Sequence, residues 1–225
     1  MVKIKWYGHS SFEINGSNVT IGTDLFPGSV IGITASPSFS ADIILSSHSH
    51  PDHYGRKIVK KCSKDDTTIL KWKNGDHGTI KGVKVKGIAS NHDDKGGLLR
   101  GPNTIYVFEV DQITFCHLGD LGHVLNEEQV KEIGEIDVLL IPIGGGFTVG
   151  LKGVQKIIEQ LSPKIVIPCH YYFKGMSIMY KILGTIKRFL KIGYENVREL
   201  DSSNTEISKD NLPSSMEVLI FKPPE

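Results

Sequence analysis

The chain has 225 residues, of which 39% are hydrophobic and 23% are charged, so it is long enough to bury one substantial core. Its 26 Lys and Arg residues nearly balance its 25 Asp and Glu residues, which leaves a net charge of +1 and excludes a global field that would attract nucleic acid or an anionic membrane. Three cysteines without CxxC spacing, Cys62, Cys116 and Cys169, argue against a disulfide framework or a cysteine-built zinc site.

The first half of the chain predicts short β-strands that are bounded by Gly, Asn, Asp or Pro. The expected strands are Val2–Trp6, Phe12–Ile14, Val19–Thr23, Ile43–Ser46, Thr68–Trp72, Val83–Ile88, Thr104–Val110 and Ile113–His117. Segments 15–18 and 111–112 each separate two neighbouring strands, and their turn-forming residues predict two hairpins.

The second half predicts helices that alternate with apolar strands. The expected helices are Asn126–Ile133, Leu151–Leu161 and Ser177–Lys191, and the expected strands are Val138–Ile141, Ile165–Pro168 and Glu217–Phe221. Asn126 is expected to cap the first of these helices. Strand-rich ends that flank central helices predict an α/β fold in which two packed sheets are covered by helices.

The chain shows no sign of further segments with a separate role. No repeat, low-complexity tract or linker interrupts it, so we expect a single domain over residues 1–225. No stretch approaches the ~20 apolar residues that span a bilayer, and the first residues lack a secretory apolar segment. We therefore expect a soluble cytoplasmic protein with no membrane partner.

Four candidate metal ligands directly follow the apolar strand Ile43–Ser46. They are His48, His50, Asp52 and His53. Residues two apart point the same way in an extended segment, so His48 and His50 can converge on one ion, and Pro51 then turns the chain toward a second. Imidazole and carboxylate ligands favour Zn²⁺, with Mn²⁺ or Fe²⁺ as alternatives. The other interpretation, a histidine-rich surface loop, does not account for this spacing behind a buried strand.

The run His48-x-His50-x-Asp52-His53 resembles the HxHxDH signature of the metallo-β-lactamase superfamily. Further segments resemble the family in the same order and span nearly the whole chain. They are Trp6–Phe12, Thr23–Phe26, Cys116–Asp120, Ile141–Gly145 and Ile167–His170. Together they look like its small metal-dependent hydrolase branch, which is related to ascorbate-6-phosphate lactonase. The resemblance implies a four-layer αββα sandwich.

The resemblance also implies two divalent metal ions and the residues that would hold them. One site would comprise His48, His50 and His92, the other Asp52, His53 and His170, and Asp120 would bridge the two. A bridge is needed because cations ~3.5–4 Å apart repel each other unless anionic oxygen lies between them. His92 is favoured as the third ligand of the first site, and His117 remains the alternative.

Several other residues are expected near these ligands. Asp24 is expected to support the metal-binding loop, as the family's aspartate does at this position. His9, His117 and His123 are candidates for contacts with ligands or substrate, with hydrogen-bonded structural histidines as the alternative. The glycine-rich segment 144–150 is expected to form either a tight turn or a backbone cradle for an anion.

The chemistry implied is hydrolysis of an ester, lactone or phosphodiester bond in a small-molecule substrate. Two ions that share a water lower its pKa toward neutrality, which yields a hydroxide that attacks carbon or phosphorus. Asp52 is expected to orient this nucleophile as it ligates metal, and His117 is the second catalytic candidate. A homo-oligomer is compatible with the sequence, which does not fix the oligomeric state.

Two alternative functions are retained. An RNA-processing nuclease or phosphodiesterase shares HxHxDH, but the near-zero net charge and the lack of a basic, glycine-rich arm make nucleic acid an unexpected partner. A non-catalytic metal-binding module would be expected to lose ligands, and the set here is complete. Ser49 between the two motif histidines argues against the redox chemistry of flavodiiron-type relatives, which carry glutamate there.

Overall fold

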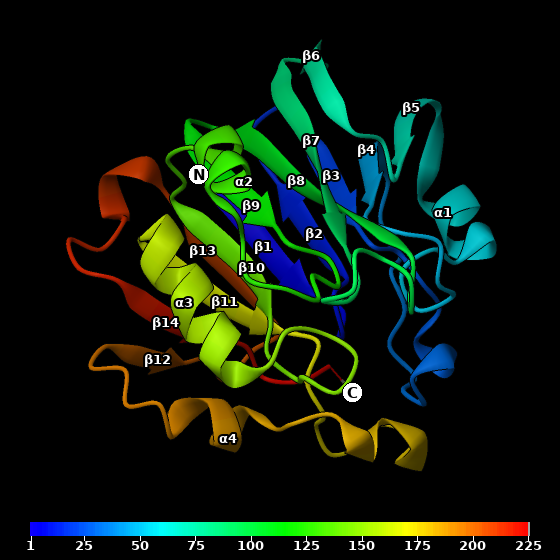
Figure 1. Ribbon diagram of the computed structural model, residues 1–225. Coiled ribbons are helices and arrows are strands. Elements are labelled where there is room, and N and C mark those ends of the chain that lie inside the picture. The colour runs from blue at the N-terminus through cyan, green and yellow to red at the C-terminus, as the bar shows by residue number, and fades with distance from the viewer. Residues whose placement is uncertain (225) are drawn as a thin grey trace.

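The computed structural model describes residues 1–224 and consists of two β-sheets packed face to face, with helices outside them (Figure 1). Glu225, the last residue of the predicted domain, lies outside the described residues. The strands are β1 Val2–Trp6, β2 Phe12–Asn15, β3 Thr20–Thr23, β4 Ala41–Ser46, β5 Ser63–Lys71, β6 Gly75–Ile80, β7 Val83–Asn91, β8 Pro102–Val110, β9 Ile113–His117, β10 Val138–Pro142, β11 Ile165–Cys169, β12 Val197–Glu199, β13 Asn204–Ile207 and β14 Glu217–Ile220. One sheet has the order β13-β1-β2-β3-β4-β5 and the other β12-β14-β11-β10-β9-β8-β7-β6.

Helices cover the outer faces of both sheets. The α-helices are α1 Arg56–Cys62, α2 Glu127–Ile133, α3 Leu151–Leu161 and α4 Ile186–Leu190, and the 3₁₀ segments are η1 Gly28–Val30, η2 Ile178–Ile182 and η3 Lys209–Asn211. Val59 and Cys62 of α1 pack with Ile44 of β4, outside the six-stranded sheet. Helices α2 and α3 lie along the eight-stranded sheet (Figure 1). This layering confirms the predicted αββα sandwich.

The two sheets share one hydrophobic core, because alternate side chains of each strand point inward. In β1 the side chains of Val2, Ile4 and Trp6 are buried and the intervening lysines are exposed. From the opposite sheet, Phe108 and Phe115 stack with their ring centroids 5.5 Å apart. None of the helices in the described part of the chain is long and apolar enough to cross a bilayer.

Local sequence signals predicted several elements correctly. Asn126 caps α2 by accepting a hydrogen bond from Gln129 N at 2.8 Å. The hairpin turn at Asp111 and Gln112 has φ values of 47° and 65°, the left-handed pair that a tight two-residue turn requires. The predicted strand Ile113–His117 and the helix Leu151–Leu161 are found with the same bounds.

The helix predicted over Ser177–Lys191 is wrong as a single element, because the structure divides it into η2 and α4. The chain is extended at Leu183 and Thr185. Gly184 donates its N–H to Gly144 O at 2.6 Å and accepts a hydrogen bond from Tyr172 N at 2.9 Å. These backbone bonds to distant loops replace the bonds that a continuous helix would make.

Asp137, directly before β10, contacts side chains or backbone of β9, of η3 and of the segment just before β11. Its carboxylate accepts hydrogen bonds from Thr114 N at 3.0 Å and from Lys209 Nζ at 2.8 Å, and Lys164 Nζ lies 3.3 Å away. Burial tends to raise the pKa of Asp137, but these donors outweigh it and lower the pKa. The anionic form is therefore favoured by folding.

We expect Asp137→Asn to lower the free energy of unfolding by about 1–3 kcal/mol at pH 7, as is typical when a charged hydrogen-bond partner is lost. Since the folded pKa is lowered, the contribution is present above the unfolded value of about 3.9 and is lost as pH falls through the folded value. Urea titrations of both proteins at pH 7 and pH 3 test this. A difference in stability that stays constant over this range would contradict it.

Candidate metal centre

Five loops meet at one edge of the sandwich, where parallel strands of both sheets end. The loop after β4 carries His48, His50, Asp52 and His53. His92 follows β7, Asp120 follows β9 and His170 follows β11, while His9 lies in the turn between β1 and β2. Because β3, β4 and β5 are parallel, as are β9, β10 and β11, their carboxyl ends bring these loops together.

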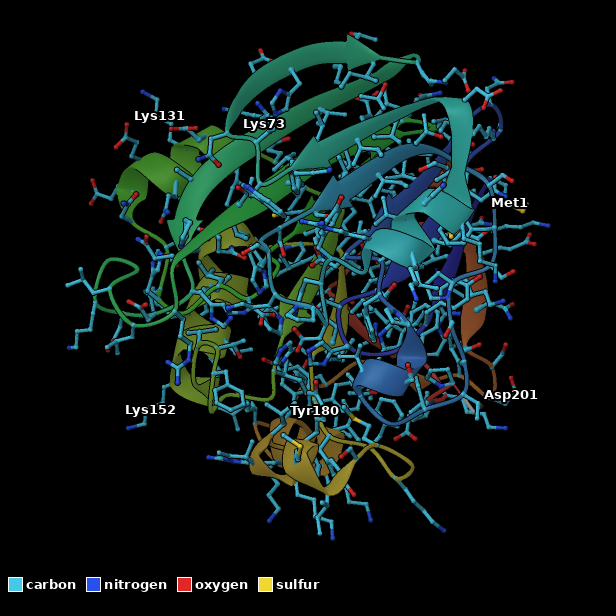
Figure 2. The ribbon with its side chains drawn as sticks, turned by 90° about the vertical axis from the view of Figure 1, so that its right-hand side faces the viewer. Met1, Lys73, Lys131, Lys152, Tyr180 and Asp201 are labelled. Atoms are coloured by element: carbon cyan, nitrogen blue, oxygen red, sulfur yellow. The ribbon has the colours of Figure 1, made fainter. Side chains whose placement is uncertain are left out.

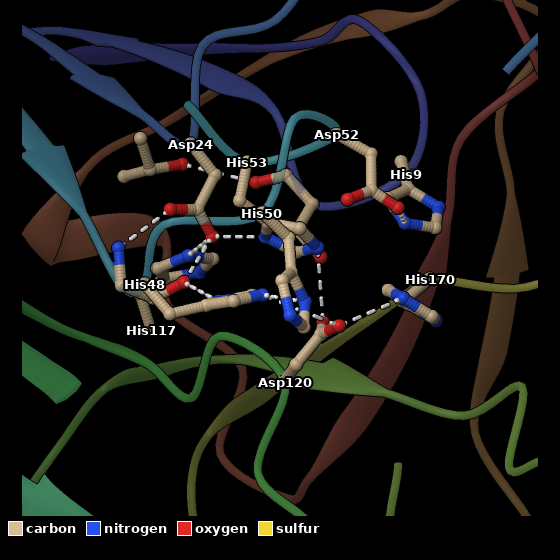
Figure 3. Close-up of polar contacts among 12 residues, drawn as sticks. His9, Asp24, His48, His50, Asp52, His53, His117, Asp120 and His170 are labelled. Carbon is tan, nitrogen blue, oxygen red and sulfur yellow. Dashed lines mark hydrogen bonds and ion pairs between the residues drawn. The ribbon is translucent and has the colours of Figure 1, made fainter. Parts of the chain in front are cut away.

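Asp120 lies at the centre of this cluster (Figure 3). Its two carboxylate oxygens face four imidazole rings that come from three different loops. The distances from Nε2 to the nearer oxygen are 3.1 Å for His92, 3.1 Å for His170, 3.2 Å for His53 and 3.9 Å for His48. Burial tends to raise the pKa of Asp120, but the adjacent His170 and His53 rings lower it well below its usual range. The carboxylate is therefore an anion.

The first predicted ligand set is brought together as a group. Donor atoms of His48, His50 and His92 lie within 4.8 Å of one another. The ring of His117 belongs to none of the three such groups among residues 1–224. Of the two candidates for the third ligand, the structure thus places His92 beside His48 and His50.

The second predicted set is arranged differently. His53 and His170 form a group with His9, and Asp52 instead lies beside His9, with Oδ2 3.2 Å from His9 Nε2. The rings of His9 and His170 are 3.8 Å apart at their centroids. His9 is fully buried, and burial together with the adjacent His170 lowers its pKa to about 4. A neutral His9 therefore lies between Asp52 and His170.

Asp24 orients candidate ligands from the side of the cluster opposite Asp120 in Figure 3. Its Oδ2 accepts from His53 Nδ1 at 2.9 Å, which directs His53 Nε2 toward Asp120. The same carboxylate accepts from Ser47 N at 2.7 Å and from Ser47 Oγ at 2.9 Å, and Ser47 Oγ lies 2.9 Å from His48 Nδ1. The supporting role expected for Asp24 thus matches its contacts, since two candidate ligands depend on it.

His117 contacts the same oxygen of Asp24 as His53 does, and it belongs to no candidate ligand group among residues 1–224. Its Nε2 is 2.7 Å from Asp24 Oδ2, its ring is fully buried, and it does not line the cavity. The catalytic role predicted for His117 therefore stays a prediction, and its position favours orienting Asp24. His123 has a structural arrangement, in which Nε2 accepts from Asn91 N at 3.2 Å and Nδ1 donates to Val124 O.

A cavity of about 470 Å³ opens above the cluster. Apolar side chains and one cation complete its walls, and sequence reasoning identified none of them. They are Val30, Leu99, Arg100, Phe147, Met179 and Tyr180. Tyr180 lies on η2, at the lower edge of the molecule in Figure 2. Burial and the neighbouring Asp52 raise the pKa of Tyr180, so its neutral hydroxyl faces that carboxylate.

The glycine-rich segment forms a turn in which three backbone N–H groups are used within the protein. Phe147 N and Thr148 N donate to Gly145 O, and Val149 N donates to Leu121 O. Of the two expectations for this segment, the geometry fits the tight turn, and its contribution to the cavity is the ring of Phe147.

Gly119 allows the loop that carries Asp120 to approach the loop that carries His48. Its φ is +56°, and a Cβ there would lie 2.4 Å from Ser47 Cβ and 2.5 Å from Asn103 Oδ1. We expect Gly119→Ala to displace Asp120 and to lower metal affinity by about 10–100-fold, as loss of supporting contacts does. Competition with a chelator measures this.

Gly134→Ala is the matched control, because Gly134 has a similar φ of +69° but open space around its Cβ position. That variant should lose a little stability and keep its metal affinity. Equal metal affinity in the two variants would contradict the prediction, because the close approach of Gly119 to Ser47 would then have no effect on the position of Asp120.

Comparison with known proteins agrees with this architecture. The beta-lactamase superfamily domain family matches residues 3–170. A UPF0173 metal-dependent hydrolase of Thermococcus onnurineus is 33% identical over 190 residues, which cover 76% of this chain and 85% of that protein. A similar protein from Thermococcus kodakarensis is 32% identical over 193 residues, with the same coverage.

Solved structures extend the likeness to the whole chain. A crystal structure from Thermotoga maritima, described as a candidate Zn-dependent hydrolase of the metallo-beta-lactamase superfamily, is 33% identical with a TM-score of 0.78, and the match covers 98% of each chain. The sequence relationship, the fold and the convergence of histidines on Asp120 agree with one another. The chain belongs to the UPF0173 family of metal-dependent hydrolases, within the metallo-β-lactamase superfamily.

Proposed function

We propose that this protein holds two divalent ions, most favourably Zn²⁺, and hydrolyses an ester, lactone or phosphodiester bond of a small molecule. The observation that carries the proposal is the placement of one buried anionic carboxylate, Asp120, within 3.9 Å of four imidazole nitrogens. Such a donor set fits borderline divalent ions, and Mn²⁺ or Fe²⁺ would also be accepted. The relatives named metal-dependent hydrolases support the same reading.

We assign the ligands to two adjacent sites. His48, His50 and His92 would hold one ion, Asp52, His53 and His170 the other, and Asp120 would contact both. His9 is the additional candidate beside the second ion, since it groups with His53 and His170. The pKa of His48 is lowered to about 2 by burial and the adjacent His53, so its ring is neutral and has a lone pair available for a cation.

Bound divalent ions would lower the pKa of a water molecule toward neutrality and so supply a nucleophile. Asp52 is placed to orient that water, because its carboxylate faces the cavity between His9 and Tyr180. The adjacent His9, whose Nε2 lies 3.2 Å from Oδ2, lowers the pKa of Asp52 although burial tends to raise it. Asp52 therefore stays anionic and can accept a hydrogen bond from the water.

The test combines metal analysis with a substrate screen. The protein is loaded with zinc, manganese or iron, its metal content is measured, and it is assayed against lactones, phosphodiesters and thioesters, with Asp120→Ala as the control. We expect two ions per chain and turnover that requires Asp120. Metal without Asp120-dependent turnover would instead support a binding module, and cleavage of RNA alone would support a nuclease.

A further inference from the structure

An ordered loop carries Leu99 and Arg100 to the wall of the cavity. A hydrogen bond from His92 N to Gly101 O, 3.1 Å long, closes the base of this loop. The carboxylate of Asp93 accepts four backbone N–H groups inside it. The donors, at 2.8–3.0 Å, are Lys95, Gly97, Leu99 and Arg100. Because these bonds hold the backbone of the loop in place, Leu99 and Arg100 have defined positions at the cavity wall.

Exposed apolar side chains gather around the same cavity. Leu99 is 68% exposed, and Met179, which also lines the cavity, is 80% exposed. Phe147 of the glycine-rich turn, another lining residue, is 40% exposed. Leu98, beside Leu99 in the chain, and Ile178 and Ile182, on the same η2 segment as Met179, are exposed as well. A cluster of large exposed apolar side chains is uncommon on a protein surface and marks a binding site. A cavity of about 470 Å³ is the size of a small-molecule site.

Arg100 adds a specific charge to this apolar surface. It is the one Lys or Arg side chain on the cavity wall, and its Cζ lies 5.3 Å from the centroid of the Phe147 ring. No carboxylate within residues 1–224 forms an ion pair with it. An arginine stacked on an aromatic ring, with its hydrogen-bonding edge free, is suited to pair with a carboxylate or phosphate.

Resting on the proposed hydrolase function, we propose that the substrate carries an anionic group and an apolar group in addition to the scissile bond. The anion, a carboxylate or phosphate, pairs with Arg100. The apolar group lies against Leu99, Phe147 and Met179, and the scissile bond lies over Asp120. For an ester, water adds its oxygen to the acyl carbon, the carbon–oxygen bond to the alcohol breaks, and the alcohol oxygen takes one proton while the other goes to solvent.

The binding test uses three probes that share one apolar group, namely 4-phenylbutyrate, 4-phenylbutyl phosphate and the neutral 4-phenylbutan-1-ol. Calorimetry on the metal-loaded protein gives the Kd of each. We expect the tighter-binding of the two anionic probes to have a Kd about tenfold lower than that of the alcohol. Arg100→Gln should remove this difference, because the charged hydrogen bond to the anion is then lost. Arg100→Lys should retain part of it. Leu99→Ser should weaken all three probes about fivefold.

Arg56→Gln is the matched control, since Arg56 is exposed on α1 and does not line the cavity. A wild-type protein without anion preference, or an Arg100→Gln variant that keeps it, would overturn the proposal. The proposal would also be overturned if the protein bound none of the probes but sedimented with phosphatidylglycerol vesicles. The exposed apolar side chains would then contact a membrane.

A kinetic comparison separates this inference from the proposed function. The mono-p-nitrophenyl ester of adipic acid and the p-nitrophenyl ester of hexanoic acid have equal acyl chains, and only the first has a carboxylate. We expect kcat/KM to favour the adipic ester in the wild type and the ratio to fall to about one in Arg100→Gln. If neither ester is hydrolysed, the result contradicts ester hydrolysis as the proposed function. The Kd values of the three probes still test whether Arg100 binds an anion.

Discussion

Asp120→Ala is expected to abolish turnover and to reduce the bound metal from the two ions proposed for each chain to one or none. The carboxylate faces His48, His53, His92 and His170 together. Without it, two adjacent cations would repel each other unscreened. We expect kcat/KM to fall by about 10³-fold or more, which corresponds to a loss of several kcal/mol of transition-state stabilisation.

Elemental analysis and steady-state kinetics on the same preparations check this prediction. Asp120→Asn keeps the size of the side chain and removes its charge, so it tests whether the anion itself is needed. Asp210→Ala, on η3 far along the chain from the ligands, is the control for a lost surface carboxylate. Full metal content together with wild-type kinetics in Asp120→Ala would contradict the bridging role.

The convergence of His48 and His50 was predicted from their spacing, and their ring nitrogens lie 3.0 Å apart. The segment that carries them consists of bends and a turn after β4, so its backbone differs from the extended course that was assumed. The αββα sandwich, which is confirmed, also followed from local patterns and from the family resemblance. Ligands distant in the chain, such as His92 and His170, came from the resemblance alone. The composition of the chain and the spacing of its residues do not determine which strands end at the same edge of the sandwich, so they could not place His92 and His170 beside the loop after β4.

Features set by contacts between distant segments were not predictable from local patterns. The break between η2 and α4 follows from hydrogen bonds of Gly184 with Gly144 and Tyr172. That break places Tyr180 beside Asp52, where a continuous helix would have had a different course. Likewise, β6 pairs with β7 although its sequence, Gly75–Ile80, has little apolar alternation. Tertiary pairing decided the structure in each case.

The arrangement beside the metal centre leads to the second large effect, that of Asp24→Ala. Asp24 is fully buried and adopts a left-handed backbone with φ of +44°, and its carboxylate contacts His53, His117 and Ser47. Removing it leaves two buried imidazoles and one buried N–H without their acceptor. We expect a loss of about 3–5 kcal/mol in the free energy of unfolding, the range for breaking a buried charged pair, and a fall in Tm of about 10 °C.

Metal affinity should fall as well, by about 10–100-fold, because His53 and His48 lose the contacts that direct their rings. Burial tends to raise the pKa of Asp24, but His117 and His53 lower it. The stabilising effect of Asp24 is therefore present above the unfolded pKa of about 3.9 and is lost as pH falls through the lower folded pKa.

Asp24→Asn keeps a hydrogen-bond acceptor and replaces the alanine variant if that variant does not fold. Asp42→Ala removes a half-buried carboxylate from β4 and should leave metal affinity unchanged. Equal metal affinity in Asp24→Ala and Asp42→Ala would mean that the rings are held by packing, and that Asp24 contributes only to stability.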